Sequence, residues 1–397
     1  MFSDHYMSCW QQVLELSQQG CDGDTFIPET GSASEFARIL WARDFGRGGD
    51  LDRALLARSA QIKSALYGNR VFPLVPMYVS SVCVEQCLYC NYRAGNKGVQ
   101  VERRRLSLEE LEREAVYLIE EKGLKVLELV YASDPLMRGA AMCKHVERLR
   151  NLLEQRGGGM VGISAEPLDE QEYRNLIDAG LTFSVLWQET YDRSRYAELH
   201  PGKTRKTDFA YRLNAFDRML SAGLKHVGIG VLSGLAAWRA DWAMLMLHEE
   251  YLRQQYRCGT DILGTPRLKH APGAVLHETP FIPTTGEFHA AVALHNIFSP
   301  TTAAFVSTRE EWETCIEMAR GGGCLFTLNC ATTPGGYSLK HGGRQFAARS
   351  YDAPIYAPRL EALGLHPVFD WTFDLLEQPS AISHQPSEAE TKAAACD

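Results

Sequence analysis

The sequence predicts an α/β fold, a (β/α)8 TIM-type barrel preceded by a helical N-terminal extension. Two observations support this fold. Eight short apolar runs of strand length alternate with segments that mostly carry helix signals. Each run is followed by a connection long enough for a crossover helix, as a parallel barrel requires. A doubly wound open sheet is the alternative. The expected strands cover residues 74–80, 126–131, 160–165, 183–187, 226–232, 261–268, 303–307 and 324–328.

The helical segments carry ordinary helix signals. The run from Leu51 to Ile62 is amphipathic and lies before the first strand. Ser107 and Glu110 have the spacing of a capping box at the start of the helix that follows the first strand. The chain is therefore expected to divide into a helical extension (1–70), the barrel (71–337), a C-terminal α/β closing segment (338–376) and a disordered tail (377–397) rich in Ser, Pro, Glu and Ala.

The bulk composition excludes several classes of protein. A net charge of −8 argues against a nucleic-acid-binding surface, which would be basic. No apolar run approaches the roughly 20 residues that cross a bilayer, so we expect no membrane association. The N-terminus lacks the basic and apolar regions of a secretory signal. Eleven cysteines without such a signal favour a reducing compartment, and a cytoplasmic location is expected.

Three cysteines form the most informative motif. Cys83, Cys87 and Cys90 have the spacing CxxxCxxC and follow directly after the first expected strand. A structural iron–sulfur cluster normally takes four cysteines, and a structural zinc site also wants four closed ligands. Three thiolates can instead bind three irons of a [4Fe-4S] cluster and leave the fourth iron open to a ligand. The expected ligand is S-adenosylmethionine, which such a cluster cleaves to a 5′-deoxyadenosyl radical.

Other roles for these cysteines are a disulfide, buried thiols, or the zinc or thiol redox chemistry of a CxxC pair. The full triplet, with the aromatic Tyr89 before its third cysteine and a strand before its first, favours the radical cluster. Cys324 and Cys330 flank the eighth strand, but no further ligands are evident near them. They are expected to be small buried thiols.

Polar residues follow the other strands at the end where barrel enzymes carry their active sites. Carboxylates there could bind the amino group of S-adenosylmethionine, and amides and hydroxyls could bind its ribose. Their other role is capping of the following helix. The candidates are Tyr131, Ser133 and Asp134 after the second strand, Glu166 after the third, and Gln188 and Glu189 after the fourth.

Two arginines are candidate carboxylate ligands. Arg212 lies on the helix after the fourth strand and could bind the methionyl carboxylate, or could be an ordinary surface arginine. Ser307 and Arg309 follow the seventh strand, where a guanidinium beside hydroxyls is suited to the α-carboxylate of an amino acid. The alternative for Arg309 is an ion pair with Glu310 or another acid of the barrel.

In these motifs the chain resembles the radical S-adenosylmethionine aromatic amino acid lyases. This family includes 2-iminoacetate synthase, the tyrosine lyase that matures [FeFe]-hydrogenase, and 3-methyl-2-indolic acid synthase. The resemblance runs from about Tyr67 to Tyr337. It is carried by the cysteine triplet and by the segments 67–70, 76–80, 188–191, 211–213, 228–235, 266–268, 307–310 and 334–337.

The resemblance implies a reaction and a set of roles. In the family, the adenosyl radical abstracts hydrogen from the amino group of tyrosine or tryptophan, and the tyrosine lyases then cleave Cα–Cβ to dehydroglycine and a cresol. It implies that the three cysteines bind the cluster and that Tyr89 lies near the adenine. Glu166, Gln188, Glu189 and Arg212 would surround the cofactor, with Tyr131, Ser133 and Asp134 beside them, while Tyr78, Ser307 and Arg309 would bind the amino acid.

Two positions depart from the family pattern. Members usually carry Gly-Glu after the second strand, where the glutamate meets the methionyl amine, but this chain has Ala132-Ser133. A carboxylate is missing there unless Asp134 or another residue replaces it. Asn91 stands where a glycine usually follows the third cysteine. The cysteine-rich C-terminal domain of the hydrogenase maturase is not recognisable, so chemistry at a second cluster is not expected.

These observations predict a radical lyase that acts on a free aromatic amino acid, tyrosine first. Its partners would be this small substrate and an external electron donor such as flavodoxin or ferredoxin. The alternatives are a related enzyme acting on tryptophan or another amino acid in a specialised biosynthetic pathway, and an iron–sulfur sensor or scaffold that has lost catalysis.

Overall fold

A computed structural model describes residues 1–20, 26–96 and 102–377 of the chain. Eight parallel strands, β1 to β8, pair in sequence order, and β1 pairs with both β2 and β8, which closes the sheet into a barrel. This closure confirms the predicted (β/α)8 fold and rules out the open sheet. The strands are β1 (Arg70–Ser80), β2 (Val126–Tyr131), β3 (Met160–Ser164), β4 (Phe183–Trp187), β5 (His226–Gly230), β6 (Ile262–Gly264), β7 (Ala303–Val306) and β8 (Leu325–Thr327).

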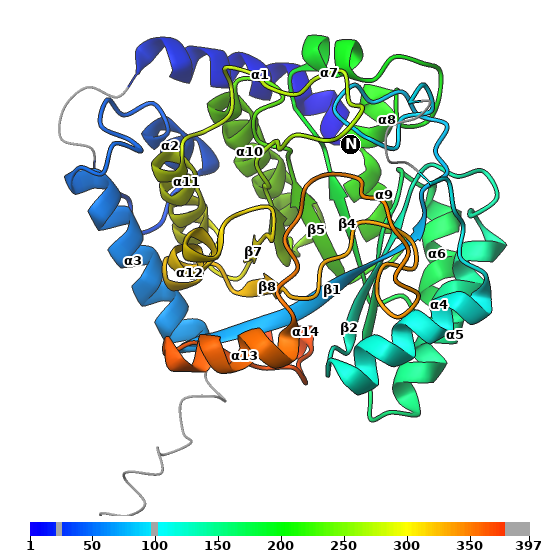
Figure 1. Cartoon of the computed structure of the whole chain (residues 1–397). Helices are drawn as coiled ribbons and strands as arrows, with labels where there is room; N and C mark the ends of the chain where they lie inside the picture. The colour runs from blue at the N-terminus through cyan, green and yellow to red at the C-terminus, as the bar shows by residue number, and fades with distance from the viewer. Residues whose placement is uncertain (21–25, 97–101, 378–397) are drawn as a thin grey trace, which may run out of the picture.

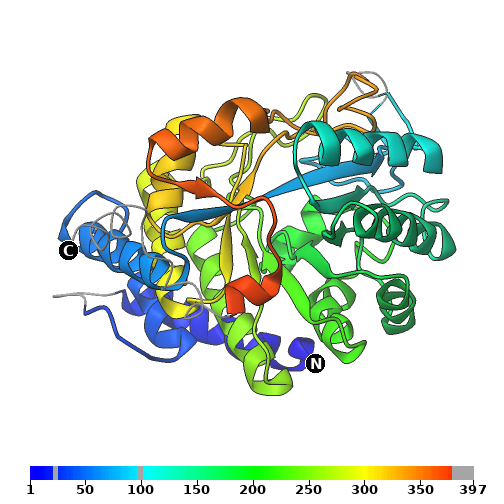
Figure 2. The same ribbon diagram turned by 90° about the horizontal axis from the view of Figure 1, so that it is seen from below.

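Helices surround the barrel, as the view along its axis shows (Figure 2). The helices between and after the strands are α4 (Leu108–Val116) with a π-helical turn, η1 (Tyr117–Glu121), α5 (Ala140–Glu154), α6 (Glu170–Asp178), α7 (Arg193–Leu199), α8 (Phe209–Leu213), α9 (Ala215–Ser221), α10 (Trp238–Tyr256), α11 (Thr285–Phe298), α12 (Trp312–Arg320) and α13 (Ala353–Ala362). Ser107 caps α4 through the expected reciprocal contacts with Glu110.

Three helices precede the barrel: α1 (Phe2–Gln19), α2 (Ala33–Ile39) and α3 (Asp50–Tyr67). The first two pack on α10, and α3 packs along α11 (Figure 1). After α13, the short strand β9 (His366–Pro367) pairs with the start of β1, and α14 (Phe373–Glu377) follows it. Both α13 and α14 lie at the end of the barrel opposite α1 and α7 (Figure 1). The tail expected to be disordered lies, from residue 378 on, outside the described residues.

An apolar plug fills the lower half of the barrel. It combines inward side chains at the beginnings of the strands with Trp371 and Phe373 from the C-terminal segment. Above it, the ring of Trp187 reaches across the interior because Gly264 has no side chain; a Cβ at Gly264 would lie 1.9 Å from the Trp187 ring. The interior is therefore closed from below and open only at the carboxyl ends of the strands. The plug comprises Phe72, Leu74, Val126, Met160, Phe183, Val185, Ile262, Ala303, Cys324 and Leu325 with Tyr67, Trp371 and Phe373.

The strand bounds differ most from prediction at β1, which begins at Arg70 and not at residue 74, and at β6. This strand ends at Gly264, whereas the sequence pattern extended it to residue 268. Pro266 has no backbone N–H to donate to a ladder, which explains the early end. No helix in the described part of the chain is long and apolar enough to cross a membrane.

Candidate active site

A cavity opens at the carboxyl ends of the barrel strands, and the cysteine triplet forms part of its wall. Residues from the loops after most of the strands line it, as a site built at this face requires. Twelve of the fourteen candidate residues line the cavity. They are Tyr78, Cys83, Cys87, Tyr89, Cys90, Tyr131, Ser133, Glu166, Glu189, Arg212, Ser307 and Arg309.

The loop that carries the cysteines is fixed by backbone hydrogen bonds. Val84 N donates to the Ser133 carbonyl at 3.1 Å, and Leu88 N donates to the Leu199 carbonyl at 3.0 Å. All three cysteines are free thiols, so a disulfide does not explain the triplet. Burial raises the pKa of Cys83 and that of Cys87 to about 11. Binding of metal would replace these protons.

The arrangement of thiols fits a cluster better than a single metal ion. Among the residues that the structure describes, no three His, Cys, Asp or Glu side chains converge so as to hold one ion. A [4Fe-4S] cluster binds each cysteine to a different iron, so its ligands need not converge on one point. Cys90 Sγ also accepts hydrogen bonds from Tyr92 N at 3.3 Å and Gln345 Nε2 at 3.5 Å. Such N–H···S contacts are suited to a thiolate in a cluster.

Glu189 is the centre of a buried ion-pair group beside the triplet. Its Oε1 lies 2.9 Å from Lys206 Nζ and 3.3 Å from Arg212 Nη2. Burial acts to raise the pKa of Glu189, but the charges of Lys206 and Arg212 outweigh it and lower the pKa to about 2. The Glu189 backbone has φ 72°, a left-handed conformation that a non-glycine residue seldom adopts. Strain of this kind is common at binding sites.

Two further carboxylates line the cavity near Ser133. Glu166 is paired with Arg138, whose Nη2 lies 2.6 Å from Glu166 Oε2. Glu85, within the cysteine loop, accepts a 2.7 Å hydrogen bond from Thr204 Oγ1, and its other oxygen is buried without a partner among the described residues. Glu85 therefore lies in the cavity wall on a loop bonded to Ser133, the residue that replaces the family glutamate.

Two of the predicted cofactor residues, Asp134 and Gln188, do not line the cavity. The Asp134 carboxylate accepts hydrogen bonds from Ser80 Oγ at 2.6 Å and from Arg105 Nε at 2.6 Å. Asp134 therefore fixes the start of the cysteine loop and has turned away from the cavity. The Gln188 side chain is fully buried and has no hydrogen-bond partner among the described residues.

Two tyrosines of the cavity wall are fixed by histidines. The Tyr89 hydroxyl lies 2.8 Å from His200 Nε2, and burial lowers the pKa of His200 to about 3, so its ring is neutral. The neutral ring donates through Nδ1 to the Tyr196 carbonyl and accepts from Tyr89 through Nε2. The Tyr131 hydroxyl lies 3.0 Å from Nδ1 of His145. Both tyrosine rings are therefore held rigidly at the mouth.

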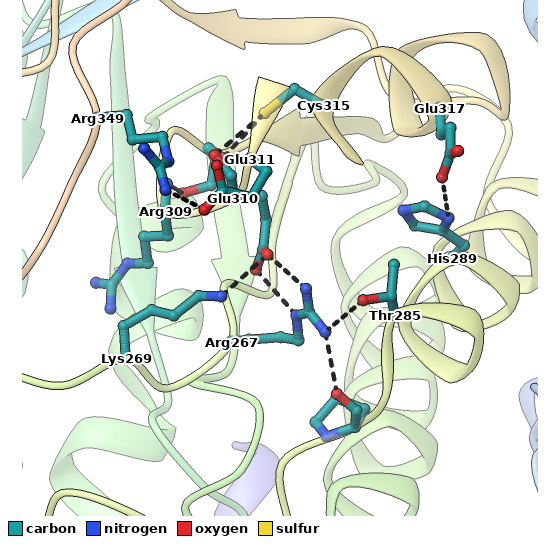
Figure 3. A network of polar contacts seen from close by, with 12 residues as sticks. Arg267, Lys269, Thr285, His289, Arg309, Glu310, Glu311, Cys315, Glu317 and Arg349 are labelled. Carbon is teal, nitrogen blue, oxygen red and sulfur yellow. Dashed lines mark hydrogen bonds and ion pairs between the residues drawn. The ribbon is translucent and has the colours of Figure 1, made fainter. Parts of the chain in front are cut away.

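Arg309 is a partly buried cation without an ion-pair partner in the described residues. Its guanidinium stacks over the Phe346 ring at 3.5 Å from the ring centre. The neighbouring Glu310 is instead bound by Arg267 and Lys269, and the Arg309 side chain points away from that group (Figure 3). An ion pair with Glu310, the alternative raised by the sequence, is therefore wrong. Burial lowers the pKa of Arg309, which shows that the charge is held in an unfavourable environment.

The comparisons with known proteins agree with this geometry. Residues 77–238 match the Radical SAM superfamily. The chain is 30% identical to 2-iminoacetate synthase of Escherichia coli (strain K12) over 325 residues, which cover 80% of this chain and 82% of the relative. The chain belongs to the radical SAM superfamily. Its members use a [4Fe-4S] cluster and S-adenosylmethionine, so both are cofactors of this enzyme.

Two other relatives are informative. The structure of the FeFe-hydrogenase maturase HydG from Carboxydothermus hydrogenoformans superposes with a TM-score of 0.78 at 26% identity, over 94% of this chain and 81% of that one. The 3-methylornithine synthase of Methanosarcina barkeri is 29% identical over 51% of this chain and 55% of its own length. This radical SAM enzyme is thus similar to proteins with several different names.

Several residues of this radical SAM site were missed by the sequence reasoning: Glu85, Glu128, Lys206, Gln345 and Phe346. Lys206 and the pair Gln345 and Phe346 lie in long irregular segments, where no periodicity marks a side chain as inward. Cys330 was expected to be a buried thiol, which the structure confirms, but it also lines the cavity. Glu128 could have been found, because it interrupts an apolar strand at an inward position.

The protonation of Glu128 should affect stability. Burial raises its pKa from an ordinary value near 4.5 to about 8, so the folded chain keeps a proton that the unfolded chain loses above about pH 4.5. Stability should therefore fall between about pH 4.5 and 8. We expect Glu128→Gln to raise the melting temperature of the ligand-free protein at pH 8 and to change it little at pH 5. An equal effect at both values would show that Glu128 is not held neutral.

Proposed function

We propose that this radical SAM enzyme is a lyase that acts on a free aromatic amino acid, with tyrosine as its substrate. It would fragment the Cα–Cβ bond to dehydroglycine and p-cresol. The observation that carries this proposal is Arg309, a partly buried guanidinium without an ion pair among the described residues, in the same cavity as the three cysteines. A carboxylate that enters the cavity would supply the missing partner.

The residues of the cavity then have distinct roles. Cys83, Cys87 and Cys90 would bind the cluster, which with S-adenosylmethionine supplies the 5′-deoxyadenosyl radical. Glu189, already ionised, and Arg212 would bind the charged end of the cofactor.

The substrate side of the cavity is organised around Gln345. Its Oε1 accepts a 2.7 Å hydrogen bond from the Tyr78 hydroxyl, and its Nε2 donates to Cys90 Sγ. Gln345 therefore connects a predicted cluster ligand to a predicted substrate residue. Ser307 and Arg309, on the same wall, would hold the amino acid through its α-carboxylate.

Anaerobic incubation tests the proposal directly. The reconstituted protein, with S-adenosylmethionine, a strong reductant and tyrosine, should release 5′-deoxyadenosine and p-cresol together. Deoxyadenosine without p-cresol would reject tyrosine cleavage but retain the radical chemistry. A protein with a full cluster that fails to cleave S-adenosylmethionine would instead favour the sensor or scaffold.

A second candidate is a relative that acts on tryptophan or another amino acid. Ser133 favours it, because the hydroxyl stands where lyases of this family usually place a glutamate. The similarity to 3-methylornithine synthase also favours a different amino acid. Formation of 5′-deoxyadenosine that depends on the added amino acid, measured for each candidate in turn, would identify the substrate. In either case a flavodoxin or ferredoxin would supply electrons, and a reducing cytoplasmic location would keep the thiols available.

We also propose that Glu85 takes the place of the missing glutamate and binds the methionyl amine. One of its carboxylate oxygens has no partner among the described residues, Glu85 lines the cavity, and the cysteine loop that carries it is bonded to Ser133. Glu85→Gln should therefore weaken S-adenosylmethionine binding by about 10-fold to 100-fold, the range expected for a hydrogen bond to a charged group. The change in the electron paramagnetic resonance of the reduced cluster on titration with S-adenosylmethionine measures this affinity.

The control for this prediction is Glu112→Gln, which removes a carboxylate on the outer surface of α4. It should leave both the cluster content and the titration unchanged. If Glu85→Gln titrates like the wild type, another group binds the amine.

A further inference from the structure

Glu128 lies on the inner face of β2, at the floor of the cavity. Residues alternate between the two faces of a strand, so Val126, Glu128 and Val130 point into the barrel while Leu127 and Leu129 pack outside it. Val126 belongs to the apolar plug that closes the barrel from below. Glu128 is therefore the first inward side chain of β2 above the plug, and it lines the cavity.

Glu128 and Arg309 lie at different depths of this cavity. Glu128 precedes the last residue of β2, Tyr131, by three positions, which places it roughly 10 Å along the strand from its carboxyl end at about 3.3 Å per residue. Arg309 follows the last residue of β7, Val306, by three positions and therefore lies at the mouth. A ligand whose carboxylate meets Arg309 can extend its other end toward Glu128.

No described residue donates a hydrogen bond or a charge to Glu128, which is only 6% exposed. Two tyrosine hydroxyls of this region already donate elsewhere. Tyr78 donates to Gln345 Oε1, and Tyr337 donates to the Pro76 carbonyl at 2.5 Å. A largely buried carboxyl group without a protein partner is costly unless water or a ligand satisfies it. Because Glu128 lines the cavity, a ligand there is placed to supply that partner.

Two aromatic side chains that pack on the plug line the same cavity as Glu128. Trp187 and Phe305 line the cavity and meet edge to face, with ring centres 6.1 Å apart. An apolar cavity with a single polar group is typical of small-molecule sites that recognise one functional group of the ligand.

We propose that Glu128 determines specificity by accepting a hydrogen bond from a donor at the far end of the substrate side chain. This inference rests on the proposed function, in that the substrate is an amino acid held at its carboxylate by Arg309. A phenol hydroxyl and the ammonium group of a basic side chain both supply such a donor. The aromatic walls favour the phenol, and an amino acid that lacks the donor would leave Glu128 buried and unsatisfied.

Equilibrium binding of amino acids to the protein loaded with cluster and S-adenosylmethionine tests this role. In each of two matched pairs, the members differ only in the hydrogen-bond donor. The pairs are tyrosine with phenylalanine, and lysine with norleucine. The wild type should prefer the donor-bearing member of one pair by at least about 10-fold, since sites built to bind a hydroxyl reject the analogue that lacks it. Glu128→Leu should reduce that preference to within about 3-fold.

A second variant distinguishes a hydroxyl donor from an ammonium donor. It also controls for a folding defect in Glu128→Leu. Glu128→Gln keeps an acceptor oxygen, so it should retain part of a preference for tyrosine, but it should lose a preference for lysine because the negative charge is gone. Both variants should keep the iron content of the wild type. A preference for either donor that survives in Glu128→Leu, or no preference in the wild type for either pair, would overturn the inference.

The outcome also separates this inference from the proposed function. A preference for lysine over norleucine that depends on Glu128 would support the role of Glu128 while rejecting tyrosine as the substrate. Release of p-cresol by Glu128→Leu with unchanged discrimination would support the lyase and reject the role of Glu128.

Discussion

Replacing Cys87 by alanine should abolish cluster binding and all formation of 5′-deoxyadenosine. Cys87 is buried in the cavity wall as a free thiol, and its loop holds it beside Cys83 and Cys90. With two thiolates remaining, the cluster loses one of its three protein ligands. Iron and sulfide analysis after anaerobic reconstitution, together with chromatography of the nucleoside, measures both losses.

Cys143 provides the matched control. It is a partly buried cysteine on α5 that packs against the outer core. Cys143→Ala should keep the full iron content and the full rate. Normal cluster assembly in Cys87→Ala would contradict the assignment of these cysteines as the cluster ligands.

Replacing Arg309 by alanine should weaken amino acid binding by on the order of 100-fold to 1,000-fold, because it removes the partner of a buried carboxylate. The cluster and the affinity for S-adenosylmethionine should remain. Arg309→Lys should have an intermediate effect, since an ammonium group keeps the charge but cannot make paired parallel hydrogen bonds. The amino acid concentration that gives half-maximal deoxyadenosine formation measures this change.

Arg349 is a suitable control for Arg309. It lies nearby, pairs with Glu311 at the surface and is half exposed. Arg349→Ala should change the half-maximal concentration by less than about 3-fold, because exposed ion pairs contribute little. Loss of the cluster in Arg309→Ala would instead show that this arginine has a structural role.

The fold could be predicted from the sequence because the signals were local. All eight expected barrel strands are present, since each is a continuous apolar run between helix patterns. The cysteine triplet is also local, and its spacing alone indicates the cluster. Position after a strand was a useful guide to the cavity, and it correctly placed Glu166, Glu189 and Arg309 there.

Asp134 and Gln188 also follow strands, but neither of them lines the cavity. Asp134 is bound by Arg105, a residue 29 positions earlier in the chain, and no pattern in the sequence reveals that pairing. Lys206 was missed for the same reason, because its partner Glu189 lies 17 positions away across an irregular segment. Side-chain partners of this kind depend on how loops fold over the mouth.

Substrate identity is the central claim, and mass spectrometry of the products tests it most directly. The reconstituted protein should be incubated anaerobically with each aromatic amino acid in turn. We predict p-cresol and 5′-deoxyadenosine in equal amounts from tyrosine, and neither in substrate-dependent amounts from phenylalanine. Substrate-dependent deoxyadenosine from another amino acid, with no p-cresol from tyrosine, would contradict the account.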